Sequence, residues 1–149
     1  MTEGRIALDA MGGDEAPGAI MDGALASLEG EDALSADRIV LVGDSGSIEA
    51  HLSECGGNPG FEIIHAADAV GMAEDPRRAL RSKPDNSITR AAQFVKDGGG
   101  TGLVSMGNTG MVVAASTLLL GRLPGIRMPG IAVTAGFTGN PIVLVDMGA

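Results

Sequence analysis

The sequence contains almost no aromatic residues: it has no Trp and no Tyr, and Phe makes up 2% of its 149 positions. Hydrophobic residues nevertheless account for 44% of the chain. A buried core must therefore be built from aliphatic side chains, with the eight methionines filling gaps that aromatic rings would otherwise occupy. This length and composition predict one domain with a core of its own.

Cysteine, positive charge and long apolar segments are also scarce. Cys55 is the only cysteine, so no internal disulfide can form, which fits a reducing compartment. Ten basic and 19 acidic residues give a net charge of −9, which argues against binding to nucleic acid or to a broad anionic membrane surface. The longest apolar run, 111–120, is far shorter than the ~20 residues that span a bilayer, and no signal-peptide pattern begins the chain. We therefore expect a cytoplasmic protein without a nucleic-acid partner.

Glycine, in contrast, is abundant, with 24 residues that follow no strict period. Short apolar segments alternate along the chain with segments of helical periodicity. Strands are predicted over 5–10, 38–43, 61–66, 101–105, 130–135 and 141–148, and helices over 17–28, 45–55, 75–82, 86–97 and 109–121. Such alternation predicts an α/β domain in which helices cover both faces of a mostly parallel sheet, giving three layers.

Three predicted strand-to-helix loops, 11–17, 43–47 and 105–110, follow strands of this sheet. Because the carboxyl ends of parallel strands lie at one edge, we expect these loops to share the edge at which α/β proteins bind ligands. The first loop contains Gly12-Gly13 and Asp14, which fit a turn with a helix cap at least as well as a phosphate-binding turn. In the second, Ser45 or Ser47 is the expected helix cap, and Asp75 and either Asn86 or Ser87 are the expected caps of the helices over 75–82 and 86–97. The third loop is the strongest candidate for a site.

The stretch Ser-Met-Gly-Asn-Thr-Gly, 105–110, lies between two apolar segments. Gly107 and Gly110 would let a ligand approach the main chain, and the helix that begins near Thr109 presents N–H groups and the positive end of its dipole. Asn108 and Thr109 add side-chain donors, and Ser105 adds a hydroxyl. This combination suits an anion. The alternative is a turn with an Asn or Thr cap that binds nothing.

Four of the ten basic residues are concentrated in one predicted helix and the residue after it: Arg77, Arg78, Arg81 and Lys83. Arg77 and Arg81 are four residues apart and would share one helical face. Arginine binds phosphate and carboxylate groups through paired N–H donors. The cluster is therefore a candidate contact for phosphate or for an acidic protein, with a solvated helix face as the alternative.

Other chemistries lack their parts in this sequence. His51 and His65 are too few and too isolated for a zinc site, so we expect no metal and no cofactor. No Gly-x-Ser-x-Gly motif supports a nucleophilic serine. Cys55 lies near the end of a predicted helix and is a poor candidate for a nucleophile.

Several longer stretches together resemble the phosphate acyltransferase family of bacterial phospholipid synthesis. They are IALDAMGGDEAP, RSKPDNSITRAAQFVKDG, SMGNTGMVVAASTLLLGRLPGIRMPGIAV and the closing VLVDMGA, in the order of the family. The resemblance implies an α/β/α fold of the isopropylmalate dehydrogenase type and the transfer of a fatty acyl group from acyl carrier protein to inorganic phosphate. The acyl phosphate product would serve a membrane glycerol-3-phosphate acyltransferase.

That activity would give the loop a purpose, because phosphate is itself the nucleophile and needs only donors that hold it and stabilise the oxyanion. Asn108 and Thr109 would be the catalytic residues, with Ser105, Gly107 and Gly110 binding phosphate or the oxyanion. The basic cluster would dock the acidic carrier protein. Met106 and Met111 stand where the family generally has small residues, so the pocket is expected to differ in shape.

The resemblance stops at Ala149, about where the first half of the family ends. We therefore expect residues 1–149 to be the truncated N-terminal part of a single domain whose full-length form is a homodimer, cytoplasmic or peripheral to the membrane. An end on an apolar strand predicts an exposed sheet edge, self-association and weak activity of the chain alone. The alternatives are an enzyme of the same fold that uses coenzyme A or a nucleotide, like a phosphotransacetylase or a dehydrogenase, and an inactive fragment.

Overall fold

The computed structural model of this protein describes residues 4–137 and 140–145 of the chain, and the last residues of the closing VLVDMGA stretch lie outside them. Helices and strands alternate through most of this range. In chain order the elements are β1 (Ile6–Asp9), α1 (Gly18–Ala26), a 3-10 turn (Ala36–Arg38), β2 (Ile39–Gly43), α2 (Ser45–Glu54), β3 (Glu62–His65), α3 (Pro76–Ser82), α4 (Ser87–Lys96), β4 (Gly102–Val104), α5 (Thr109–Leu119), β5 (Ala132–Phe137) and β6 (Asn140–Val145).

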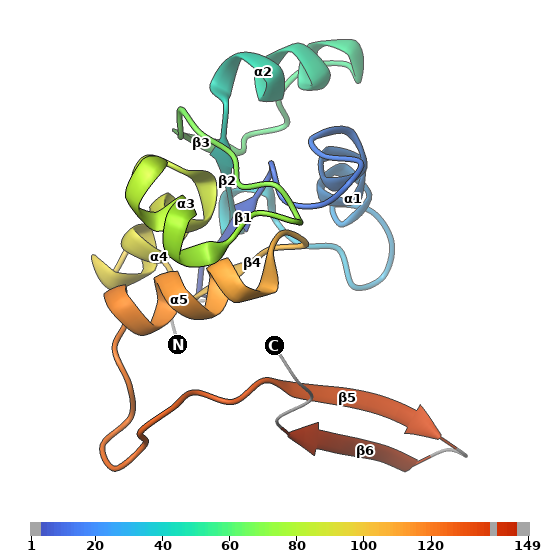
Figure 1. The fold of residues 1–149 in the computed structure, drawn as a ribbon. Coiled ribbons are helices and arrows are strands. Elements are labelled where there is room, and N and C mark those ends of the chain that lie inside the picture. Colours follow the sequence, from blue (N-terminus) through green and yellow to red (C-terminus); the bar gives the residue numbers. More distant parts are fainter. Residues whose placement is uncertain (1–3, 138–139, 146–149) are drawn as a thin grey trace.

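Four strands form one parallel sheet in the order β3-β2-β1-β4 (Figure 1). The central strand β1 pairs with two neighbours, so that Leu8 lies opposite Leu41 of β2 and opposite Val104 of β4. Strand β2 is buried along its whole length. It is therefore the doubly covered apolar strand that its sequence predicted.

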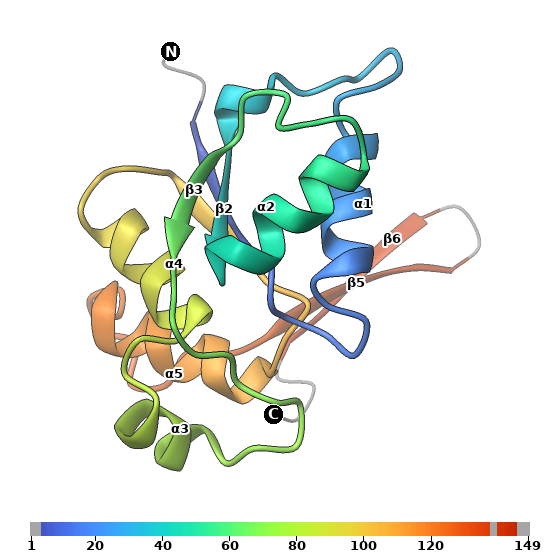
Figure 2. The ribbon, with the colours of Figure 1, turned by 90° about the horizontal axis from the view of Figure 1, so that it is seen from above.

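Helices cover both faces of this sheet. Ile39 and Leu41 of β2 pack with α1 and α2, whereas Val40 and Val42, which point the other way, pack with α4. Figures 1 and 2 place α1 and α2 on one side of the sheet and α3, α4 and α5 on the other. The predicted three-layer α/β/α arrangement is confirmed. No helix among the described residues is long and apolar enough to cross a membrane.

Side-chain caps begin four of the helices. Asp44, and not Ser45 or Ser47, caps α2: its Oδ2 accepts the Ser47 N–H at 2.9 Å and the Ser47 hydroxyl at 2.6 Å. The prediction failed because Asp44 stands one residue earlier and reaches the free N–H of the first turn with a charged oxygen. Asp75 caps α3 as predicted, and Asn86 rather than Ser87 caps α4. Asp14 does not cap α1, which Pro17 precedes without a side-chain cap.

The last two predicted strands are present, but in the described part of the chain β5 and β6 pair only with each other, as an antiparallel hairpin. Only two residues separate them, and parallel strands need a crossover of a dozen residues or more. Figure 1 shows this hairpin beside the body of the protein and outside its sheet. Several of its apolar side chains are exposed, among them those of Val143 and Val145.

Candidate phosphate site at the sheet edge

The loops after β1 and β4 meet at the carboxyl edge of the sheet, as the parallel pairing of these strands requires. Their link is Asp9, the last residue of β1, whose side chain is fully buried. Asp9 Oδ2 accepts the Ser105 hydroxyl at 2.6 Å, and its Oδ1 accepts the Met11 N–H at 3.1 Å. One carboxylate therefore satisfies donors from both loops and joins segments that are 96 residues apart.

Glycine is required where these two loops touch. A Cβ atom on Gly12 would lie 2.7 Å from the Gly107 backbone nitrogen and 2.5 Å from Asp9 Oδ2. Gly107 in turn donates its N–H to the Ser105 hydroxyl oxygen at 3.0 Å. Gly107 and Ser105 are thus used in shaping the loop, and the close approach that Gly107 permits is that of another backbone segment.

Asn108 is the N-cap of α5, and its Oδ1 accepts the Met111 N–H at 3.0 Å. Its amide nitrogen points into the segment before α3, at 2.9 Å from the carbonyl oxygen of Glu74, 3.1 Å from that of Met72 and 3.2 Å from that of Gly71. The residue is buried. We expected this side chain to donate to a ligand, but both the oxygen and the nitrogen of its amide are hydrogen-bonded to protein backbone groups.

The start of α5 remains partly open. Thr109, its first residue, is exposed, whereas Gly110 is half-buried because Pro76 of α3 lies above it. A Cβ atom on Gly110 would be 2.7 Å from Pro76 Cγ, so this glycine lets α3 pack closely on α5. The first N–H groups of a helix have no intrahelical acceptor. Within the described residues, no protein acceptor is found for the N–H groups of Thr109 and Gly110.

Besides Asn108, the side chains of Lys83 and Glu74 hold the segment 69–74 in place. Lys83 donates through Nζ to the Ala69 carbonyl at 2.8 Å and to Glu74 Oε1 at 2.5 Å, and the same Glu74 oxygen accepts the Gly71 N–H at 2.9 Å. The hydrogen bond from Lys83, followed by that from Gly71, lowers the pKa of Glu74 below its ordinary value of 4.5. A lowered carboxyl pKa stabilises the fold at neutral pH, and this contribution is lost as pH falls through the folded-state pKa.

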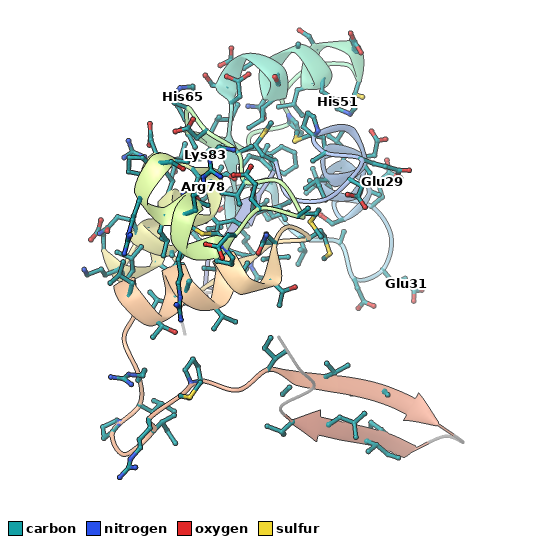
Figure 3. The ribbon with its side chains drawn as sticks, viewed as in Figure 1. Glu29, Glu31, His51, His65, Arg78 and Lys83 are labelled. Carbon is teal, nitrogen blue, oxygen red and sulfur yellow. The ribbon has the colours of Figure 1, made fainter. Side chains whose placement is uncertain are left out.

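The basic cluster separates into two parts in the structure. Arg77, Arg78 and Arg81 of α3 are exposed and line a shallow hollow with Asp75. Lys83, in contrast, is half-buried and ion-paired with Glu74. Figure 3 shows Arg78 and Lys83 on the α3 side of the molecule. The three arginines therefore form an accessible cationic surface, referred to below as the α3 arginine surface, beside the start of α5.

An apolar groove of about 480 Å³ opens on the opposite face of the sheet, between α1 and β4. Its walls come from Leu8 of β1, Ile20 and Gly23 of α1, and Val104 of β4. Met106, which belongs to the candidate loop, forms part of its rim and is 60% exposed. The groove thus begins at the loop. Met111, the other methionine beside the loop, is fully buried in the core between the helices.

Sequence reasoning missed two features. The segment 69–74 was not recognised as part of the edge, because nothing in the sequence pairs Glu74 with Lys83, which was assigned to the basic cluster instead. His51 was expected to be isolated, which is wrong: Asp22 and Cys55 lie beside it. The four-residue spacing of His51 and Cys55 in a predicted helix was a usable signal.

A family model described as "Fatty acid synthesis protein" matches residues 4–149. The chain belongs to this family. Proteins named phosphate acyltransferase are similar to it along almost its whole length: that of Heliobacterium modesticaldum is 45% identical over 97% of this chain, that of Thermosynechococcus vestitus 43% over 100%, and that of Bacillus subtilis 38% over 97%. These matches cover 43%, 43% and 42% of the respective relatives, so the chain spans about two-fifths of their length.

For this member of the fatty acid synthesis protein family, replacing Asn108 with Ala should remove the α5 cap and release the segment 71–74. We expect the free energy of unfolding to fall by about 1–3 kcal/mol, because a cap and further backbone hydrogen bonds are lost together. Hydrogen exchange of the amides of 71–74 should accelerate. Asn58→Ala is the matched control, since Asn58 makes similar turn hydrogen bonds within its own loop. Unchanged exchange at 71–74 in Asn108→Ala would contradict the link.

Proposed function

We propose that this chain is the N-terminal part of a single α/β domain of an acyltransferase that moves a fatty acyl group from acyl carrier protein to inorganic phosphate. The observation that supports this most directly is the open start of α5, where Thr109 is exposed and two backbone N–H groups have no protein acceptor among the described residues. A helix start of this kind favours a phosphate dianion. The names of the relatives support the same chemistry.

Phosphate binds, in this proposal, on the solvent side of the loop. Between Gly12 and Gly107 the buried Asp9 carboxylate would repel an anion, and the two backbones already touch there. At Thr109 the hydroxyl and the N–H groups of Thr109 and Gly110 are the donors. Asp9, Ser105 and Asn108 act as positioning residues, because their polar atoms are used in holding the loop and the helix start.

The reaction then requires no covalent enzyme intermediate. A phosphate oxygen attacks the thioester carbonyl carbon, and a carbon–oxygen bond forms while the carbonyl oxygen becomes an oxyanion. Donors that are already in place stabilise this charge without reorganisation. When the oxyanion collapses, the carbon–sulfur bond breaks, and the carrier thiolate takes up the proton that the hydrogen phosphate gives up and leaves as the thiol. The acyl phosphate remains, to pass to a membrane glycerol-3-phosphate acyltransferase.

The fatty chain needs apolar surface close to the reacting carbonyl. The groove between α1 and β4 offers such surface, and Met106 connects it to the loop. Burial of each methylene contributes about 0.8 kcal/mol, so a groove of this kind would supply much of the affinity for a long acyl group. We further propose that the family-length protein works as a homodimer, at or near the membrane that uses its product.

The α3 arginine surface is the proposed docking site of the carrier protein. In a chain of net charge −9, an acidic partner is repelled unless a local cationic surface receives it. Arg77, Arg78 and Arg81 are exposed and close to the start of α5 through the contact of Pro76 with Gly110. Lys83 is excluded from this role in the proposal because Glu74 already neutralises it.

The function can be tested in a family-length chimera, in which residues 1–149 are joined to the remaining part of the Heliobacterium modesticaldum enzyme. Thr109→Ala should reduce acyl phosphate formation by about 10²–10³, the typical effect of losing one oxyanion or phosphate donor, and leave the melting temperature almost unchanged. Thr117→Ala makes the same chemical change further along α5, where the hydroxyl donates to the Val113 carbonyl. Equal turnover in the two variants would reject Thr109 as a ligand.

The docking surface can be tested in the same chimera. Reversing Arg78 and Arg81 to Glu should slow association with acyl carrier protein and reduce its dependence on salt, since long-range attraction is screened within about 10 Å at 0.1 M. Reversal of Arg122 and Arg127, which are also exposed, changes the net charge equally and is the control. Unchanged association kinetics at low salt would exclude the surface. A raised requirement for phosphate would instead place these arginines at the phosphate.

A further inference from the structure

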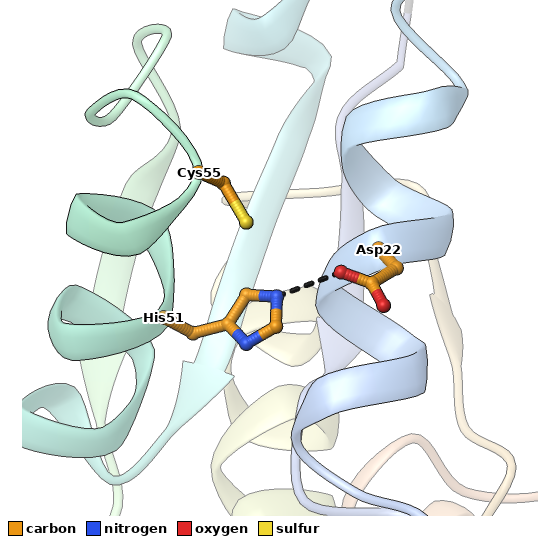
Figure 4. A group of neighbouring side chains, drawn as sticks. All are labelled: Asp22, His51 and Cys55. Carbon is orange, nitrogen blue, oxygen red and sulfur yellow. Dashed lines mark hydrogen bonds and ion pairs between the residues drawn. The ribbon is translucent and has the colours of Figure 1, made fainter.

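Three potential metal ligands meet between α1 and α2, on the sheet face opposite to α3, α4 and α5. Asp22 comes from α1, His51 from the last turn of α2, and Cys55 from the residue that ends α2. Their ligand atoms all lie within 4.8 Å of one another, and His51 Nε2 is 2.8 Å from Asp22 Oδ1. Figure 4 shows the imidazole edge directed at the carboxylate, with the cysteine sulfur above the same space.

The spacing of these atoms is close to that of a tetrahedral ion. Zinc binds nitrogen and oxygen at about 2.0–2.2 Å and sulfur at about 2.3 Å, which separates neighbouring ligand atoms by roughly 3.4–3.6 Å. The His51–Asp22 pair would have to open by about 0.6 Å, and the sulfur would have to approach by about 1.2 Å at most. Small side-chain rotations achieve both, because the Asp22 side chain is 67% exposed and Cys55 is exposed.

The backbone that carries these ligands is held in place by the core. Met21, next to Asp22, and Leu52, next to His51, are buried in one cluster that packs α1 and α2 on the sheet. The carboxyl end of α2, where His51 and Cys55 lie, carries the negative end of the helix dipole and therefore favours a cation. A bound ion would also drive the thiol to its thiolate.

We propose that Asp22, His51 and Cys55 bind a divalent cation of the zinc type and thereby fasten α1 to α2. The donor set of carboxylate oxygen, imidazole nitrogen and thiolate sulfur suits zinc, a cation of intermediate softness, better than magnesium or calcium, which prefer oxygen. Three protein ligands leave one tetrahedral position for water. The site is distinct from the proposed phosphate site. The loop 105–110 lies at the carboxyl edge of the sheet, whereas α2 begins at that edge, after Asp44, and runs towards the opposite edge, so that His51 and Cys55 lie at its far end.

The test uses the purified 149-residue chain without an affinity tag, because a histidine tag would itself bind metal. Zn²⁺ is titrated with a competing chelator, and Co²⁺ is used as a spectroscopic substitute. We expect a single equivalent of Zn²⁺ to bind, a raised melting temperature in its presence, and a Co²⁺ spectrum with tetrahedral bands and a thiolate charge-transfer band. His65→Gln is the matched control, since His65 lies outside the cluster.

Cys55→Ser should abolish the thiolate band, and Cys55→Ser, His51→Gln and Asp22→Asn should each weaken Zn²⁺ binding. Changes outside the ligand shell already weaken metal sites about 10–100-fold, so loss of a direct ligand should cost at least as much. Cys55→Ser should also lose the rise in melting temperature while keeping that of the metal-free protein. Zn²⁺ affinity that is the same in Cys55→Ser and in the parent, or a Co²⁺ spectrum without a thiolate band, would overturn the proposal.

Discussion

The hydrogen bonds of the Asn108 side-chain amide are the interactions on which the carboxyl edge of the sheet depends. Its oxygen caps α5, and its nitrogen holds the carbonyl oxygens of the segment that leads into α3. A single buried side chain therefore fixes where one helix begins and how the next segment lies against it. Without it, the packing of Pro76 on Gly110 would be lost, and the α3 arginine surface would no longer be held beside the start of α5.

The second constraint is the contact of two backbone loops around Asp9. A buried carboxylate is stable only when hydrogen bonds replace its water, and Ser105 and Met11 provide them here. The same charge makes the interior of the loop unsuitable for an anion. It therefore directs the proposed phosphate to the outer side, at Thr109. Within the six residues 105–110, Ser105, Gly107 and Asn108 hold the loop and the helix start, whereas Thr109 and Gly110 are the proposed phosphate donors.

Much of this arrangement could be predicted from the sequence. The alternation of apolar segments with helical periodicity is strong between residues 5 and 121, and the three layers, the parallel sheet and the convergence of the loops after β1 and β4 followed from it. The β5–β6 hairpin was less predictable as a separate unit, because apolar strands of this length fit a parallel sheet equally well. What could not be predicted was mainly which residues far apart in the sequence lie close together in space.

Individual side-chain roles were predictable only where the partner is close in sequence. Asp75 as the cap of α3 depends on a residue three positions away, and it was predicted correctly. The carbonyl acceptors of the Asn108 amide nitrogen are 34 to 37 residues distant, the carboxylate that accepts the Ser105 hydroxyl is 96 residues distant, and Asp22 and His51 are 29 residues apart. No local pattern contains such pairs. The sequence therefore suggested Asn108 as a ligand donor, whereas its amide is hydrogen-bonded to the protein backbone in the structure.

The most direct measurement for the central claim, that the start of α5 holds phosphate, is a titration of the isotope-labelled chain with inorganic phosphate, followed by amide NMR shifts. Saturable shifts are expected at Thr109 and Gly110. The amide of Gly46 in the first turn of α2 should not shift with them, although it too lies at a helix start. Chloride at equal ionic strength should produce neither response. Equal shifts at both helix starts, or none at Thr109 and Gly110, would contradict the claim.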